Sequence, residues 1–355
     1  MSFLGRNPRY ALALLALLFF TSILLFNSNL RGDPWPNPHS PPRWSRVSTI
    51  DFLRQAESGY QENVIRGRQD LIRRHGPTAS KVNPWPLKEW GYYTLWDFFI
   101  PGFQCPHRTA RVGTMGDGGK WVCGLEHIQR KKKCVIYSFG INGESSFEAE
   151  LLEKAPGCEV WGYDFSVTGW GPELDSYSHR AHFEPWALGP VDNHGANMNV
   201  KMWSLRGLME HNGHDFIDIL KVDIEGAEFA SLESFFNFFE SQSRPTSSPE
   251  SPMDFTPAGA RYDFSGQPLP IGQLQIELHP RESEEISRDY STFPAFLSWW
   301  EKMERLGLRP FWTEPNLVYV HLTGTKRPDL TEYSFINIRG NHELIIGDAN
   351  ELSPQ

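Results

Sequence analysis

The sequence lacks an excess of positive charge. Its 355 residues carry 34 Lys and Arg against 43 Asp and Glu, which gives a net charge of -9 at pH 7. A protein whose main ligand is a nucleic acid needs cationic side chains to neutralise phosphates, so this balance argues against a nucleic-acid partner. The short basic run at 130–133 is typical of a solvated turn before a strand.

Cysteine is scarce, and its spacing excludes the common zinc-binding patterns. The four cysteines are Cys105, Cys123, Cys134 and Cys158. In an oxidising compartment they allow about three pairings, and their positions alone do not choose among these. The chain also lacks an Asn-x-Ser/Thr acceptor for N-glycosylation, which counts slightly against a luminal location.

The N-terminal region contains a long uncharged apolar run at 10–26. As a helix it would span about 25 Å, enough for a thin early-secretory membrane. Arg6 and Arg9 precede it, and no convincing pair of small residues for signal peptidase follows it. We therefore predict an uncleaved type II signal anchor rather than a cleaved signal peptide. Residues 1–9 would be a cytosolic tail, and the body would lie in the lumen of the endoplasmic reticulum or Golgi.

Beyond the anchor, composition predicts four further segments. Residues 27–47 are rich in proline and predict a stiff stem. Residues 48–90 predict an accessory helical segment, with Ser48 as its N-cap and a stop after residue 74. The main domain would cover 91–345. Within it, 241–270 is rich in Pro and Ser and predicts a flexible surface insertion.

From residue 133 onward, short apolar strands alternate with amphipathic helices. The predicted strands are 134–140, 158–166, 181–189, 216–225, 273–280, 316–322 and 332–340. Such alternation predicts an α/β fold with a parallel sheet covered on both faces. We expect the last two strands to form a hairpin, so that seven strands make a mostly parallel sheet whose last strand is antiparallel.

Polar residues and glycines gather at the carboxyl ends of these strands, where ligands bind in open sheets. Gly140 and Gly143 would let the backbone approach a ligand closely. Asp164 follows the second strand at the spacing of a carboxylate that binds ribose hydroxyls. Asp223 and Glu225 are two residues apart, so they share one face of their strand. An ordinary turn for the glycines and a helix-terminus role for Glu225 remain alternatives.

These stretches carry a family resemblance. "ILKVDIEGAE" at 219–228 resembles the signature of FkbM-type S-adenosylmethionine-dependent methyltransferases. Three further stretches resemble that family's first cofactor motif, its second-strand acid and its fifth strand: "YSFGIN", "GYDFS" and "LQIELHP". Residues 105–123 and "EYSFIN" resemble the methyltransferase-like protein 24 family more closely. Ser138 stands where the first motif usually carries an acidic residue.

The resemblance implies a membrane-anchored, Rossmann-like class I methyltransferase that uses S-adenosylmethionine. The residues that would hold the cofactor or border its adenine are Gly140, Asn142, Gly143, Asp164, Trp186 and Ala187. The catalytic candidates, which would face the acceptor beside Glu277, are Asp223, Glu225 and His279. His279 would take a proton from a sugar or other hydroxyl, although a structural role before Pro280 fits as well. No metal is expected, and the acceptor is not assigned.

Two other functions fit the same residues. A luminal glycosyltransferase shares the tail, anchor and stem, and Asp223 with Glu225 would then chelate a divalent metal ion. A non-catalytic binding protein would keep the fold, and the departure at Ser138 is its support. We also predict that the block around 117–123 forms a hairpin-like lid or platform beside the sheet, with Cys123 paired to Cys105.

Overall fold

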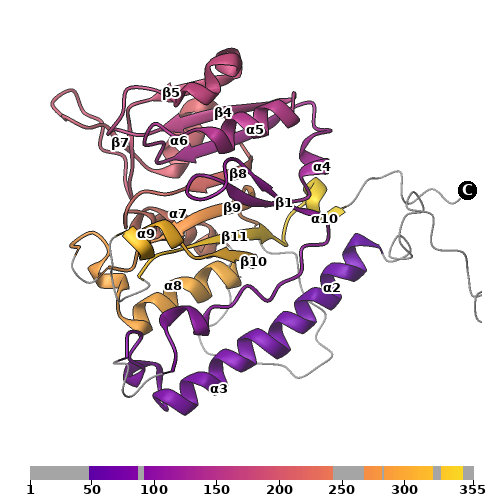
Figure 1. The fold of residues 1–355 in the computed structure, drawn as a ribbon, viewed down its shortest axis with the longest axis vertical. Helices are drawn as coiled ribbons and strands as arrows, with labels where there is room; N and C mark the ends of the chain where they lie inside the picture. Colours follow the sequence, from indigo (N-terminus) through magenta and orange to yellow (C-terminus); the bar gives the residue numbers. More distant parts are fainter. Residues whose placement is uncertain (1–47, 87–91, 243–267, 282–283, 323–328, 347–355) are drawn as a thin grey trace, which may run out of the picture. The chain divides into compact units, whose positions relative to one another are not determined.

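A seven-stranded sheet with the order β10-β11-β9-β8-β3-β4-β5 occupies the centre of the computed structural model (Figure 1). Its strands are β3 (Cys134–Phe139), β4 (Cys158–Tyr163), β5 (Ala181–Glu184), β8 (Ile217–Val222), β9 (Ile271–Leu278), β10 (Leu308–Glu314) and β11 (Thr331–Asn337). The structure describes residues 48–86, 92–242, 268–281, 284–322 and 329–346. From Thr49 onward these belong to one compact unit.

The direction of the strands confirms the predicted mixed sheet. Neighbours from β5 through β9 run parallel, and β11 runs antiparallel to both β9 and β10. The chain adds β4 and β5 on one side of β3 and then crosses to place β8 and β9 on the other side. The order of the strands therefore reverses between β3 and β8, which is where a ligand crevice is expected.

The predicted strand at 316–322 is wrong, because this segment forms helix α9 (Leu317–Leu322). The side-chain oxygen of Asn316 accepts a hydrogen bond from the Tyr319 backbone N–H at 2.9 Å, a bond typical of a helix start. The strand that pairs with β11 is instead β10, which the sequence reading missed. The expected hairpin exists, but its first strand lies earlier in the chain.

The predicted strand at 181–189 is divided in two. β5 joins the main sheet, whereas β6 (Ala187–Leu188) pairs with β7 (Met202–Trp203) in a separate small sheet. Pro185 lies between the two pieces and has no N–H to give to a ladder, which explains the interruption.

The predicted hairpin around 117–123 and the predicted pairing of Cys123 are confirmed. β1 (Thr109–Val112) and β2 (Lys120–Cys123) form an antiparallel pair. A disulfide joins Cys105 to Cys123, with 6.0 Å between their Cα atoms. The hairpin is thus fixed covalently to the segment that precedes it.

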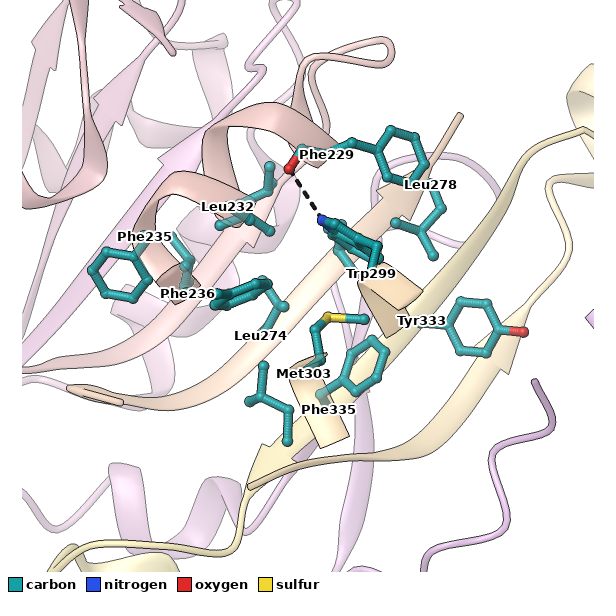
Figure 2. Close-up of a cluster of buried hydrophobic side chains, with 14 of the residues drawn as sticks. Phe229, Leu232, Phe235, Phe236, Leu274, Leu278, Trp299, Met303, Tyr333 and Phe335 are labelled. Atoms are coloured by element: carbon teal, nitrogen blue, oxygen red, sulfur yellow. Dashed lines mark hydrogen bonds between the residues drawn. The ribbon is translucent and has the colours of Figure 1, made fainter. Parts of the chain in front are cut away.

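Two hydrophobic clusters cover the two faces of the sheet. One lies under three helices: α6 (Leu205–Asn212), α7 (Glu228–Gln242) and α8 (Phe293–Arg305). Figure 2 shows part of it, where the Trp299 indole donates a hydrogen bond to the Phe229 carbonyl at 3.0 Å. The other cluster lies under α5 (Ser146–Lys154), α4 (Leu125–Ile128), α10 (Glu343–Ile346) and the hairpin.

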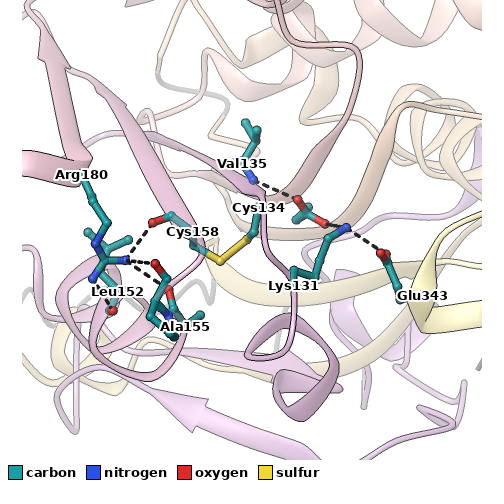
Figure 3. The surroundings of a disulfide bond; sticks show 10 residues. Lys131, Cys134, Val135, Leu152, Ala155, Cys158, Arg180 and Glu343 are labelled. Carbon is teal, nitrogen blue, oxygen red and sulfur yellow. Dashed lines mark hydrogen bonds and ion pairs between the residues drawn. A yellow bond between two sulfur atoms is a disulfide. The ribbon is translucent and has the colours of Figure 1, made fainter. Parts of the chain in front are cut away.

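A second disulfide, Cys134–Cys158, connects the first residues of β3 and β4 (Figure 3). Beside it, the Arg180 guanidinium donates hydrogen bonds to the Cys158 and Leu152 carbonyls at 2.8 and 2.7 Å. These contacts lie at the amino ends of the strands. They stabilise the end of the sheet that lies opposite to the predicted ligand crevice.

Residues 49–75 of the predicted accessory segment form one continuous helix. It consists of α2 (Thr49–Gly59), a π-helical part (Tyr60–Ile65) and α3 (Arg66–His75). Two buried ion pairs attach it to the main domain. Glu57 receives two hydrogen bonds of 2.6 Å from Arg309 of β10, and Arg68 donates two to Glu304 of α8 at 2.8 and 2.7 Å.

Several predictions concern residues outside the described part of the chain. These are the tail, anchor and stem within 1–47 and most of the insertion at 241–270. Within the described residues, no helix is long and apolar enough to cross a membrane.

The Glu57–Arg309 pair gives a stability test of the helix attachment. Glu57→Gln leaves the buried Arg309 charge unpaired, so the free energy of unfolding should fall by about 3–5 kcal/mol. Arg54→Ala on the same helix removes an exposed pair with Asp51 and should cost less than about 1 kcal/mol. Chemical denaturation of both variants measures the difference, and equal losses would contradict the role of the buried pair.

Candidate functional site

A cavity of about 750 Å³ opens at the carboxyl ends of the strands, where their order reverses. The predicted site residues that border it are Gly140, Asn142, Asp164, Trp186, Ala187, Asp223, Glu225 and His279. Gly143 does not border it. The lining residues that sequence reasoning did not select as site residues include Asp117, Lys120, Glu144, Phe165, Arg281 and Tyr319.

The glycine loop after β3 is in direct contact with the end of β8. Gly140 has a φ of +79°, and a Cβ at this position would lie 1.7 Å from the Asp223 carbonyl oxygen. Only glycine fits this position, both for its left-handed backbone and for the space available. Lys221 donates a hydrogen bond to the Gly140 carbonyl at 2.7 Å, which fixes the loop to β8.

Asp164 at the end of β4 holds the same loop from the other side. Its carboxylate accepts hydrogen bonds from the backbone N–H groups of Ile141 and Asn142 at 2.8 and 2.9 Å. It also accepts from the N–H and hydroxyl of Ser166 at 2.8 and 2.6 Å. Burial alone would raise the pKa of Asp164, but these hydrogen bonds outweigh it and lower the pKa.

A carboxylate offers about four acceptor sites, so these four bonds occupy its ordinary capacity. The main role of Asp164 in this structure is therefore to hold the glycine loop in place. Its predicted contact with ribose stays a prediction.

Ser138, where the family usually has an acid, contacts a buried carboxylate from another element. The Ser138 hydroxyl donates a hydrogen bond to the carboxylate of Glu148, which is buried on α5. Lys221 lies 3.5 Å from the same carboxylate. This carboxyl group comes from a helix and not from the strand, and it does not border the cavity.

Lys120 brings a buried positive charge to the acidic strand ends. Its ammonium forms an ion pair with Glu332 of β11 and lies 3.7 Å from Asp223. Burial would lower the pKa of Lys120, but Glu332, Asp223 and Glu277 together raise it. The same lysine helps to lower the pKa of Asp223 against the effect of burial. Both groups are therefore charged at neutral pH.

Two buried glutamines of β9 set the position of Lys120. The Gln273 amide exchanges two hydrogen bonds of 2.8 Å with the backbone of Cys123. Gln275 donates to the Trp121 carbonyl at 3.2 Å. Alternate residues of a strand share one face. Glu277 therefore lies on the same face of β9 as Gln273 and Gln275, the face that contacts β2. The sequence predicted the β1–β2 hairpin, but no sequence pattern indicated that it packs on this face of β9.

His279 lies between carboxylates and is only 1% exposed. Its Nδ1 is 3.2 Å from buried Glu228, and its Nε2 is 3.5 Å from Glu277. Burial would lower the pKa of His279, but these carboxylates raise it well above its ordinary value. A protonated imidazole has no lone pair to accept a proton, so this geometry does not favour the predicted role as a base.

The far side of the cavity is apolar and aromatic. Phe165 is 59% exposed although it is a large hydrophobic residue, and it borders the cavity beside Trp186, Ala187 and Leu188. Trp186 itself is 9% exposed and stacks on Trp203, with 5.2 Å between ring centroids. The flat rings on this side suit an adenine base. The sequence signal for Phe165 was its place directly after Asp164.

The loop role of Asp164 predicts a pH-dependent loss of stability in Asp164→Asn. The lowered pKa in the fold means that the carboxylate stabilises the protein above about pH 4, the unfolded value, and less as pH falls through the folded pKa. At pH 7 the variant should lose about 1–3 kcal/mol of unfolding free energy.

Denaturation at pH 7 and pH 3 checks this, and the difference from wild type should shrink at pH 3. Asp175→Asn, at an exposed position, is the control and should change stability by less than about 0.5 kcal/mol. A loss for Asp164→Asn that is the same at both pH values would contradict the charged role.

Comparison with known proteins identifies the family of the chain. The family described as "Methyltransferase domain" (Methyltransf_22) matches residues 59–243. The probable methyltransferase-like protein 24 of Rattus norvegicus is 34% identical over 119 residues, which cover 31% of each chain. That of Homo sapiens is 28% identical over 241 residues, which cover 57% of this chain and 64% of the relative. The chain thus spans less than two thirds of the length of these curated relatives.

The solved structures that the chain resembles are only distantly similar to it. A Methanococcus jannaschii fibrillarin pre-rRNA processing protein covers 60% of this chain and 70% of its own, with 13% identity and a TM-score of 0.30. An O-methyltransferase family protein from Burkholderia thailandensis covers 61% and 56%, with 10% identity and a TM-score of 0.28. The fold assignment therefore depends on strand order and direction. Since the family match covers more than half of the sequence, the chain belongs to this methyltransferase-domain family.

Proposed function

We propose that this protein transfers a methyl group from S-adenosylmethionine to an acceptor bound at the acidic end of the cavity. The observation that carries the proposal is the division of one cavity into an aromatic side and an acidic side, with the glycine loop between them. The family assignment supports methyltransferase activity and S-adenosylmethionine as the cofactor. The finer resemblance to FkbM-type enzymes belongs to the proposal.

The residues present fit this methyl donor in shape and charge. Phe165 and Trp186 would hold the adenine, and the loop from Gly140 to Asn142 would adjoin the amino-acid part. The cavity is bordered by six carboxylates against three Lys or Arg side chains: Asp117, Glu144, Asp164, Asp223, Glu225 and Glu277 against Lys120, Lys221 and Arg281. This negative excess suits a positively charged sulfonium.

Methyl transfer requires a positioned acceptor and a route for its proton. When bound, S-adenosylmethionine supplies an electrophilic methyl group on sulfur. Asp223 is the group best placed to accept a proton from a hydroxyl acceptor, because its side chain is 21% exposed at the cavity and Lys120 keeps it ionised. Ile286, Val318 and Tyr319 add apolar surface beside Glu277 and Arg281. We propose O-methylation of a sugar or another hydroxyl compound.

The alternative functions have weaker support. The family assignment favours a methyltransferase over a glycosyltransferase. The non-catalytic alternative depended on Ser138, and the family assignment favours a methyltransferase over it as well. The net charge of -9 argued against a nucleic-acid partner, and we propose none.

We also propose that the protein is a type II membrane protein of the endoplasmic reticulum or Golgi, held by residues 10–26. The apolar run and the preceding Arg6 and Arg9 support this orientation. Two disulfides, Cys105–Cys123 and Cys134–Cys158, suit an oxidising lumen.

Calorimetry with S-adenosylmethionine and the purified chain tests the cofactor site. Removal of the aromatic face in Phe165→Ala should weaken binding by about tenfold or more, since stacking of a base on an aromatic ring contributes about 1–3 kcal/mol. Phe238→Ala removes an exposed aromatic that does not border the cavity and should leave affinity unchanged. Absence of binding, or equal weakening by both variants, would refute the assignment.

The anchor predicts that the N-terminal segment is retained in the mature protein. Mass analysis of the N-terminus after expression in secretory cells should find residues 10–26 still attached and the protein in the membrane fraction. A mature N-terminus near Asn27 would show that the segment is a cleaved signal peptide.

A further inference from the structure

Three potential ligands converge at the acceptor end of the cavity. Asp223 follows β8, Glu277 lies in β9 and His279 follows β9. One ligand atom from each lies within 4.8 Å of the other two. We propose that these three side chains bind a divalent metal ion. The proposal deepens the proposed function, because the ion would lie where the acceptor is expected.

The separations around His279 distinguish a metal shell from direct hydrogen bonds. Its Nε2 lies 3.5 Å from Glu277, and the ligand atom of Asp223 lies within 4.8 Å of both groups. An N–H···O hydrogen bond is about 2.7–3.2 Å long. Two ligands of one ion with bonds of about 2.1 Å stand about 3.0–3.4 Å apart. The separation between His279 and Glu277 therefore needs only a small contraction around an ion.

Each of the three side chains has a partner that orients it toward the gap. Glu228 is fully buried and binds the backbone N–H of His279 at 2.7 Å and lies 3.2 Å from its Nδ1, which directs Nε2 to the cavity. Asn316 donates to one oxygen of Glu277 at 3.0 Å, while the other oxygen faces His279. Lys120 approaches Asp223 from the hairpin. Outer contacts of this kind, a carboxylate behind a histidine above all, accompany metal ligands.

Charge also favours a cation here. The carboxylates around the gap are Asp223, Glu225, Glu228, Glu277 and Glu332, and the nearby Lys and Arg side chains among the described residues are Lys120, Lys221 and Arg281. Two oxygen ligands and one imidazole suit Mn²⁺ or Zn²⁺, and a bound ion would replace the proton on Nε2 of His279. An ion with open positions would bind an acceptor hydroxyl oxygen and make its proton easier to remove.

A second group of potential ligands provides the control. His107, Glu126 and His127 also bring ligand atoms within 4.8 Å of one another, but all three are only half-buried. None of them borders the cavity. A metal ion bound by the protein can thus be assigned to one group or the other by substitution.

The test is Mn²⁺ binding to the chelator-treated full chain, followed by calorimetry and by electron paramagnetic resonance. We expect one Mn²⁺ per chain at this site, at least tenfold weaker binding in Glu277→Gln, and a change below twofold in Glu126→Gln. No binding by a folded chain, no effect of Glu277→Gln, or loss of the ion in Glu126→Gln would overturn the proposal.

If Glu277→Gln fails to fold, the coupling of bound Mn²⁺ to nitrogen in the electron paramagnetic resonance spectrum identifies the site. In Glu126→Gln/His127→Gln, the bound Mn²⁺ should still show coupling to an imidazole nitrogen, and loss of that coupling would overturn the site. S-adenosylmethionine binding is measured separately without metal. Cofactor binding without Mn²⁺ binding leaves the proposed function standing and refutes only the metal site. Mn²⁺ binding without cofactor binding leaves the metal site standing and refutes the proposed function.

Discussion

The buried ammonium of Lys120 is the interaction on which the rest of the site depends. Asp223, Glu277 and Glu332 come from three neighbouring strands and place their carboxylates close together. Without a cation among them, mutual repulsion and burial would oppose this arrangement. The cation comes from the β1–β2 hairpin, outside the main sheet. Its position depends in turn on Gln273 and Gln275, which bind β2 through its backbone, and on the Cys105–Cys123 disulfide.

The glycine loop shows a second way in which the fold holds its site. Lys221 of β8 binds the Gly140 carbonyl, and Asp164 of β4 binds the next two N–H groups. Charged side chains on both flanking strands therefore fix the loop after β3. The loop is rigid because charged groups satisfy its backbone, and its closeness to Asp223 leaves no room for a side chain at Gly140.

The cavity separates two kinds of chemistry. Aromatic and small apolar residues after β4 and in β6 lie on one side, and carboxylates after β8 and in β9 lie on the other. The accessory helix is part of the same compact unit, because Glu57 and Arg68 bind Arg309 and Glu304 in buried pairs. It stabilises α8 and β10, the elements just before Asn316. The end of the cavity near Asn316 is thus supported by elements outside β3, β4 and β8.

Local sequence patterns determined the alternating elements, the antiparallel last strand and eight residues that border the cavity. The elements follow from periodicity, and the eight residues follow from their places at strand ends together with the family resemblance. The tertiary structure decided the rest. Residues 316–322 carry a strand-like composition, yet the Asn316 cap makes them a helix. Lys120 reaches Glu332 across 212 positions of sequence, a contact that no local pattern records. Asp164 and His279 were found by position, but their charges and partners arise from groups that only folding brings together.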